Sequence, residues 1–226
     1  MSSKKHKKKR THTVPEDQAT QQQPQQQPQQ QPASKATKTV TKFTDRAGAP
    51  APVTRRFFAY LIDWYVGALC TAIPISFAAY QTSGDITNQY LTDLPAPIGI
   101  ITGAVALLFA FAYYILIPMF VWRGQTPGKR LCGVMIVERD GSPVTLRDLA
   151  LRQIIGVTII EGVIANASAI WHQMLSIATG INFVHPLMYV GFAFTLVSCI
   201  MILVRKDHRC IHDFIAGTKV ALVEKA

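Results

Sequence analysis

Two long stretches of this chain contain neither lysine nor arginine, and this absence constrains its fold more than any other feature. The 23 Lys and Arg residues lie in three blocks, Lys4 to Arg56, Arg123 to Arg152 and Arg205 to Lys225. A nucleic-acid-binding domain would interleave its cations with its core elements, so the net charge of +10 does not indicate a nucleic-acid partner. Cations segregated between long apolar runs are typical of a membrane protein whose basic segments stay in the cytoplasm.

Four apolar runs are long enough to approach the ~20 residues that a bilayer requires. The sequence predicts an all-α polytopic membrane protein with four transmembrane helices, at about 57–79, 98–122, 153–171 and 184–204. The third run is marginal because Glu161 interrupts it. With the basic blocks on one side, both the N-terminus and the C-terminus are predicted to be cytoplasmic.

Residues 1–52 are predicted to be a disordered tail, outside a membrane domain at 53–223. A block of like charges, Lys4 to Arg10, is followed by a Gln- and Pro-rich run, and neither can bury enough apolar surface to fold. The basic block is either a solvated tail that helps to set topology or a contact for anionic lipid.

The basic segment between the second and third runs is predicted to fold as a small cytoplasmic insert. Val134–Val137 resembles a strand, Asp140-Gly141 resembles the centre of a turn, and Thr145 resembles the N-cap of an amphipathic helix. The insert is therefore predicted to be β-hairpin-like, with a helix leading into the third span. After the fourth span, a short helix closed by Gly217 and a strand-like run are expected.

Each predicted span carries a polar residue about six to eight positions from its cytoplasmic end. With a rise of ~1.5 Å per residue, these residues would form one polar layer roughly 10 Å deep. The residues are Asp63, Tyr114, Glu161 and Ser198. Two interpretations of the acids remain open. In one, Asp63 and Glu161 share a proton or bind a cation transiently. In the other, Asp63 pairs with Arg56 or another cation at the cytoplasmic rim and fixes helix packing, and Glu161 snorkels or forms a hydrogen bond to a neighbouring helix.

The sequence offers little that points to an enzyme or a metalloprotein. We find no nucleophile–base arrangement, and the four cysteines show no paired spacing. His208 and His212 are four residues apart, beside Cys210 and Asp213, but no second cluster completes a tetrahedral metal set. The expectation is a non-enzymatic protein with no metal and no cofactor.

Three motifs in order resemble the RDD family of small bacterial membrane proteins. They are Arg56-Phe-x-Ala-x-Leu-Ile-Asp63, Gly124-Gln-Thr-Pro-Gly-Lys129-Arg130-Leu-x-Gly133 and His212-Asp213-x-x-Ala-Gly-Thr218. The resemblance covers about 52–223 and places the arginine and two aspartates of the family name on Arg56, Asp63 and Asp213. It implies a bacterial plasma-membrane location, and a cytoplasmic-side cluster in which Asp213 meets Arg56, with Lys129, Arg130 and His212 at the rim.

Two functions of different classes follow. One is transport of a cation or proton through the polar layer, an activity proposed for some members of the family. The other is a membrane scaffold or accessory subunit that binds a membrane-protein partner through its cytoplasmic segments. Because four spans are few for a carrier that works alone, transport would call for a homo-oligomer.

Overall fold

The computed structural model describes residues 47–162 and 166–223. In chain order these residues form β1 (Ala47–Pro50), α2 (Val53–Ser83), η1 (Leu91–Asp93), α3 (Ala96–Phe111), η2 (Ala112–Val121), α4 (Pro127–Leu131), β2 (Val134–Glu138), α5 (Leu146–Ala150), η3 (Leu151–Ile160), α6 (Asn166–Thr179), α7 (Val184–Val204), α8 (Ile211–Ile215) and β3 (Thr218–Val223). The segment η1 is a 3-10 turn, and η2 and η3 continue α3 and α5 as π-helices. The protein is mostly helical, as predicted, but its small sheet means that it is not all-α.

Among the described residues, three helical segments are long and apolar enough to cross a bilayer: α2, α3 with η2, and α7. They correspond to the predicted runs 57–79, 98–122 and 184–204. Large apolar side chains point outward, and Phe77 and Phe120 are 65% and 72% exposed. Such surfaces are costly in water, so they indicate contact with lipid. At 31 residues, α2 is about 46 Å long and exceeds the ~30 Å hydrocarbon core, so its ends reach the headgroups.

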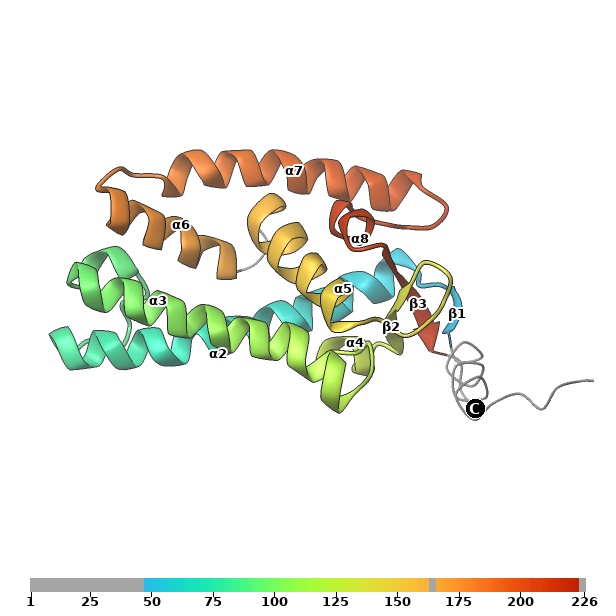
Figure 1. Cartoon of the computed structure of the whole chain (residues 1–226), viewed down its shortest axis with the longest axis horizontal. Helices are drawn as coiled ribbons and strands as arrows, with labels where there is room; N and C mark the ends of the chain where they lie inside the picture. Colours follow the sequence, from blue (N-terminus) through green and yellow to red (C-terminus); the bar gives the residue numbers. More distant parts are fainter. Residues whose placement is uncertain (1–46, 163–165, 224–226) are drawn as a thin grey trace, which may run out of the picture. The chain divides into compact units, whose positions relative to one another are not determined.

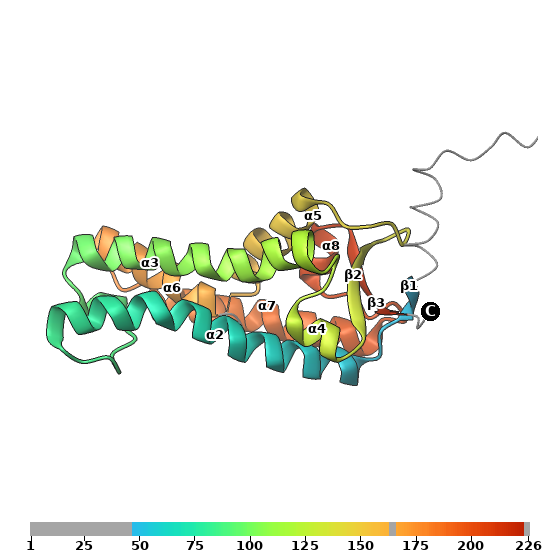
Figure 2. The same cartoon turned by 90° about the horizontal axis from the view of Figure 1, so that it is seen from below.

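The ends of these helices that carry arginine lie together, beside the sheet and the short helices (Figures 1 and 2). Arg55 lies in the first turn of α2, Arg123 follows η2, and Arg205 follows α7. We call this end, marked by Arg55, Arg123 and Arg205, the basic end. The sheet, α4, α5 and α8 all lie there.

The prediction of a continuous third helix over 153–171 is wrong. The segment η3 ends at Ile160 with Glu161 as its C-terminal residue, and α6 begins at Asn166 and continues to Thr179. Gly162 adopts a φ of +43°, which is strained for other residues, and a Cβ there would lie 3.3 Å from the Cα of Gly191 on α7. The chain therefore breaks beside Glu161, where it comes close to α7.

The insert does not form the predicted hairpin as its main pairing. Strand β2 pairs antiparallel with the C-terminal strand β3, and β1 pairs with the other edge of β3, so the order is β1-β3-β2. A turn is present, since the Gly141 N–H donates to Glu138 O at 3.0 Å, but the returning arm makes one isolated bridge, Val137 to Pro143. Proline has no N–H to donate, so that arm cannot extend the ladder.

The predicted N-terminal tail, 1–52, lies mostly outside the described residues. The prediction is wrong for the last residues of the tail, because residues 47–50 form β1 and Ala51 is fully buried beside the sheet. The Ala51 N–H donates to Val220 O at 3.0 Å, which fastens this segment to β3. The described fold thus begins before the predicted boundary at 53.

Helix α3 packs closely against η1 and α6 through two glycines spaced four apart. A Cβ on Gly99 would lie 2.7 Å from Leu91 O, and one on Gly103 would lie 2.6 Å from a Met174 side-chain carbon. The Gly-x-x-x-Gly pattern therefore serves packing within the chain. The largest apolar core lies here and includes Ile75, Leu91, Leu94, Ala106 and Ile170.

Candidate functional site

Asp213 is the centre of a buried ion cluster at the basic end. Its side chain is 0% exposed, and each carboxylate oxygen meets a guanidinium group. Arg56 Nη2 donates to Oδ2 at 2.8 Å, and Arg152 Nη1 donates to Oδ1. The Cys210 N–H and the Thr218 hydroxyl donate at 3.2 and 3.3 Å. One carboxylate thus joins α2, η3 and α8.

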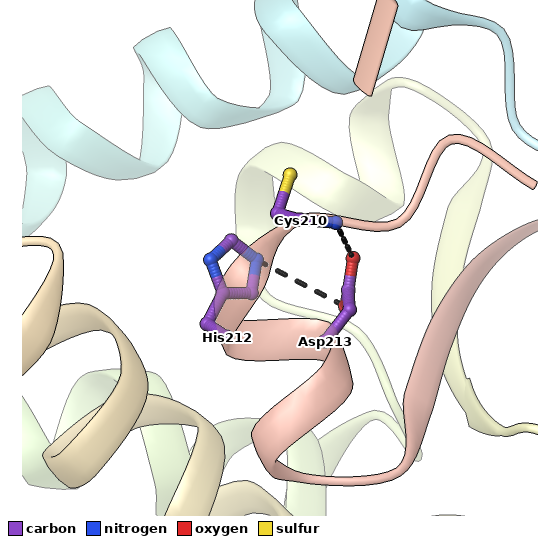
Figure 3. A group of neighbouring side chains, drawn as sticks. All are labelled: Cys210, His212 and Asp213. Carbon is purple, nitrogen blue, oxygen red and sulfur yellow. Dashed lines mark hydrogen bonds and ion pairs between the residues drawn. The ribbon is translucent and has the colours of Figure 1, made fainter. Parts of the chain in front are cut away.

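The position of Asp213 follows from how α8 begins. Cys210 is the N-cap residue, and the Asp213 carboxylate, three residues on, accepts its backbone N–H (Figure 3). An acid in the first turn also offsets the positive end of a helix. His212 lies beside this pair, with Nε2 at 3.9 Å from Asp213 Oδ1.

Asp63 forms a second ionic site, between α2 and the loop that enters α4. Its Oδ1 accepts from the Tyr113 hydroxyl at 2.8 Å and from the Gly128 N–H at 2.9 Å. Its Oδ2 accepts from the Thr126 hydroxyl and from Lys129 Nζ, the latter at 2.9 Å. Four donors surround a side chain that is 3% exposed, so this carboxylate fastens the loop to the helix.

Two glycines permit the close approach of this segment to its neighbours: Gly124 in the loop and Gly128 in α4. A Cβ on Gly128 would lie 2.4 Å from Ala59 O and 2.7 Å from Asp63 Oδ1, so only glycine permits this approach. Gly124 has a φ of +70°, and a Cβ there would lie 2.3 Å from Ile136 O. The Gly124 carbonyl accepts the Ile136 N–H at 2.7 Å, which joins the loop to β2.

Glu161 is the third acid of the site, at the break after η3. Its Oε1 accepts from the Ser198 hydroxyl at 2.8 Å and from the His212 N–H at 3.0 Å, and its Oε2 contacts His212 Nδ1 at 2.8 Å. Arg152 Nη2 lies 2.9 Å from His212 Nε2. A guanidinium group only donates, so Nε2 accepts and the imidazole proton lies on Nδ1, where it donates to Glu161.

Asp63 and Glu161 line the same cavity, of about 430 Å³. Its walls come from α2, η2, the loop before α4, α4, β2, α5, η3, α7, α8 and β3. The charged and titratable residues that line it are Arg56, Tyr60, Asp63, Tyr114, Lys129, Arg152, Glu161, Cys199, Cys210 and His212. No acid among them faces the cavity without a cationic or histidine partner in the described structure. The acidic and basic groups that line the cavity therefore nearly balance in charge.

The RDD family model matches residues 50–217 of the chain. This chain belongs to the RDD family. An uncharacterized protein of Bacillus subtilis (strain 168), YckC, is 37% identical over 113 residues, which are 50% of this chain and 56% of YckC. The chain thus spans little more than half the length of that relative. No solved structure matches the chain.

The three RDD motifs meet at the basic end, as the resemblance implied. Arg56 pairs with Asp213, and Asp63 pairs with Lys129 from the middle motif. Of the two partners considered for Asp63, the rim cation is the one present, and Arg56 is engaged elsewhere. Arg130 does not join the cluster, because it is exposed and lies over the Trp122 ring at 4.7 Å.

The predicted polar layer is resolved into two groups. The Tyr114 hydroxyl donates to the Asp63 carbonyl at 2.8 Å, and Ser198 donates to Glu161. The two carboxylates have separate partners, so the structure gives no shared proton between them. Sequence reasoning missed Arg152, and it also missed Tyr113 and Thr126, which donate to Asp63. The one signal for Arg152 is its position as the last cation before the third apolar run.

Cys210, His212 and Asp213 lie close enough to suggest a metal site (Figure 3). The chemistry of these residues argues against it. Asp213 already neutralises two guanidinium groups, and burial raises the pKa of the Cys210 thiol to about 12, with Asp213 adding to the effect. A metal needs the thiolate, so this group fits a structural role.

Acid titration should reveal the buried pair. Burial alone would raise the pKa of Asp213, but Arg152 and Arg56 hold it below its usual value. Its stabilisation is therefore complete above the unfolded pKa of about 3.9 and is lost as pH falls below that value. We expect the free energy of unfolding of Arg56→Met to be about 3 kcal/mol lower than that of wild type at pH 6, which lowers the unfolding temperature. The difference between the two proteins should shrink below about pH 4.

Arg55→Met is the matched control, because Arg55 is the exposed neighbour of Arg56. This variant should keep the acid dependence of the wild-type unfolding temperature. A gap between Arg56→Met and wild type that is equal at pH 6 and pH 3 would contradict the assignment.

Proposed function

We propose that this RDD protein carries protons, alone or in exchange for a small cation, and that Glu161 is the residue that takes up the proton. The observation that supports this most is the placement of Glu161: it lines the cavity inside the helical bundle, and its Oε2 contacts His212 Nδ1 at 2.8 Å. An ionisable pair at that depth is costly, and in membrane proteins such pairs commonly serve proton or ion pathways. The proposed role is non-enzymatic.

The arrangement in the membrane is part of the proposal. Segments η3 and α6 together form a fourth, discontinuous crossing, beside α2, α3 with η2, and α7. Both termini and the basic end lie in the cytoplasm, and the protein lies in the bacterial plasma membrane. The segregation of Lys and Arg supports this orientation. The working unit is a homo-oligomer, since a few spans rarely form a carrier alone.

Glu161 is a better proton carrier than Asp63 because of what surrounds each carboxylate. Asp63 accepts from four donors, one of them the Lys129 ammonium group, so a proton or cation would have to displace several contacts at once. Glu161 accepts three bonds, and Oε2 has one, from His212. We assign Asp63 a structural role.

The broken helix gives Glu161 a favourable setting for positive charge. The C-terminal end of a helix carries partial negative charge, and discontinuous helices often hold ions at such ends. Here the end of η3 coincides with Glu161, and the Thr195 hydroxyl from α7 donates to the Glu161 carbonyl at 2.5 Å. A proton on Glu161 would be attracted to the same end.

Protonation of Glu161 also has a mechanical consequence in this proposal. The carboxylate accepts both the backbone N–H and the Nδ1–H of His212, so it holds α8 against the break. A neutral carboxylic acid is a weaker acceptor, so proton uptake would loosen α8 from η3. If proton uptake is coupled in this way to a movement of α8, the cavity would open alternately to the two sides of the membrane.

The test is proton flux in liposomes that contain the purified protein and a trapped pH-sensitive dye. Wild type should dissipate an imposed pH gradient, with or without Na⁺ or K⁺, and Glu161→Gln should reduce the rate per folded protein by at least about tenfold. Such a loss is typical of removing a group that itself transfers the proton. Asp140→Asn is the matched control, because Asp140 is an exposed turn acid whose acceptor role the amide retains.

The variant Asp63→Asn tests whether Asp63 and Glu161 have different roles. We expect it to lower the yield of folded protein and to leave the flux per folded molecule within a few-fold of wild type. A Glu161→Gln variant that folds and keeps full flux would sink the proposal. No flux from well-folded wild type, with a partner protein retained in mild detergent, would favour the scaffold function instead.

A further inference from the structure

The two guanidinium groups of the buried ion cluster share one carboxylate, that of Asp213. Arg56 Nη2 donates to one of its oxygens and Arg152 Nη1 to the other. The second negative charge belongs to Glu161, whose Oε2 contacts His212 Nδ1 at 2.8 Å, while Nε2 of the same ring lies 2.9 Å from Arg152 Nη2. With a neutral imidazole, these two cations and two carboxylates balance. A proton on Glu161 therefore leaves one positive charge in excess.

The neighbouring titratable groups do not supply the missing negative charge. In the described structure Asp63 pairs with Lys129, and α5, which packs on η3, carries one residue of each sign, Arg147 and Asp148. The buried Arg209 donates to the backbone carbonyls of residues 213 and 218, so it adds positive charge behind the cluster. The phenols, thiols and imidazoles that line the cavity or lie on α6 and α7, mostly neutral near pH 7, are those of Tyr60, Tyr114, His172, His185, Tyr189, Cys199 and Cys210.

The cavity has room for an anion with an apolar body beside this cluster. Its volume of about 430 Å³ lies within the range of small-molecule sites. Arg56, Arg152, Glu161 and His212 all line it. Much of the remaining wall is apolar and comes from Val134, Ile136, Leu149, Val157, Ile202 and Val220. An unpaired charge in such surroundings is costly, so an anion that enters when Glu161 is neutral restores the balance.

We propose that the cavity binds a small organic monocarboxylate together with one proton, with the ligand carboxylate beside Arg152 and His212 and its apolar body against the apolar wall. The proton neutralises Glu161, and the ligand replaces the lost negative charge. Arginine is well suited to this role because its donors match the geometry of a carboxylate. The inference rests on proton uptake by Glu161, as in the proposed function, but not on transport. A proton and a monoanion that move together carry no net charge.

Benzoate is the probe, because it is a monocarboxylate with an apolar ring. Its binding to the purified protein in detergent is measured by titration calorimetry in two buffers of different ionisation enthalpy, which counts the protons taken up. We expect about one proton per benzoate, and an affinity that falls by up to about tenfold per pH unit from pH 6 to pH 8. Benzamide has the same ring without the charge and should bind at least about tenfold more weakly at pH 6.

Glu161→Gln gives the sharpest result, because it fixes this position in a neutral state. The variant should bind benzoate without proton uptake and equally at pH 6 and pH 8. At pH 8 it should bind at least about tenfold more tightly than wild type, a gain that misfolding cannot produce. Asp140→Asn, which changes an exposed acid outside the cavity, should keep the pH dependence of wild type.

A double variant tests whether the excess charge holds the anion. Adding Arg152→Gln to Glu161→Gln leaves Arg56 and Asp213 as a balanced pair. We expect this protein to bind benzoate at least about tenfold more weakly than Glu161→Gln alone. A single gel-filtration peak checks that each variant is folded.

The outcomes decide the proposal. Benzoate binding that takes up a proton in wild type, and that becomes independent of pH in Glu161→Gln, supports the site. Absence of binding, binding without proton uptake, equal binding of benzamide, or weaker binding by Glu161→Gln than by wild type at pH 8 would overturn it. Binding in detergent requires no flux, so a protein that binds but does not transport contradicts only the proposed function. Proton flux without benzoate binding contradicts only this inference.

Discussion

Replacing Asp213 with asparagine is expected to cost about 3–5 kcal/mol of stability, enough to prevent most of the protein from folding. The amide keeps the size of the carboxylate but not its charge, so Arg56 and Arg152 would be left buried without a counter-charge. Breaking a buried ion cluster by removing one member is costly for this reason. The fraction of monodisperse protein and its unfolding temperature in detergent measure the effect.

Asp207→Asn is the control for this change. Asp207 also pairs with an arginine, but its side chain is 36% exposed and that of Arg205 is 45% exposed. Exposed pairs contribute about 0–1 kcal/mol, so this variant should behave like wild type. If the two asparagine variants lost equal stability, the buried cluster would not be what holds α2, η3 and α8 together.

Gly124→Ala is expected to be nearly as damaging, although it adds one methyl group. The new Cβ would lie 2.3 Å from Ile136 O, a backbone atom that cannot move without disturbing β2. Overpacking of this kind costs about 1–3 kcal/mol, and the φ of +70° adds roughly 1–2 kcal/mol more. We expect a loss of about 3 kcal/mol in unfolding free energy, measured by thermal unfolding in detergent.

Gly217→Ala isolates the clash from the backbone strain. Its φ is +67°, close to that of Gly124, but nothing lies within 4 Å of a Cβ built there. This variant should lose only the roughly 1–2 kcal/mol of left-handed strain. An equal loss for both alanine variants would show that the contact with Ile136 contributes nothing.

The long helices were predictable because lipid imposes a simple requirement. A segment that crosses hydrocarbon must be long and apolar, and composition alone reveals this for α2, α3 with η2, and α7. The third run satisfied the same rule only partly. Its break depends on Gly162 lying against Gly191, a contact between distant residues that no local pattern records.

The sheet shows the same limit from another side. The strand-like character of residues 134–137 and 219–223 was visible, because short apolar runs between turns favour strands. Which strand pairs with which was not visible. Asp140-Gly141 favoured a local hairpin, whereas the ladder forms between β2 and β3, about 80 residues apart in the chain.

The candidate site was predictable as a set of residues more than as a set of contacts. The motifs led to the pairing of Arg56 with Asp213, which is present. The partners of Asp63 and Glu161 depend on how the loop before α4 and the helix α8 fold back beneath the bundle. Equal depth in the membrane suggested that the two acids meet, but depth says nothing about position around the bundle.

The order of strands in the sheet has a consequence for biogenesis. The central strand, β3, is the last to leave the ribosome, and both of its neighbours, β1 and β2, are synthesised earlier. The sheet at the basic end can therefore close only after the helices that precede β3 have been synthesised. Without β3, neither β1 nor β2 would have its partner in the ladder, so the sheet could not form.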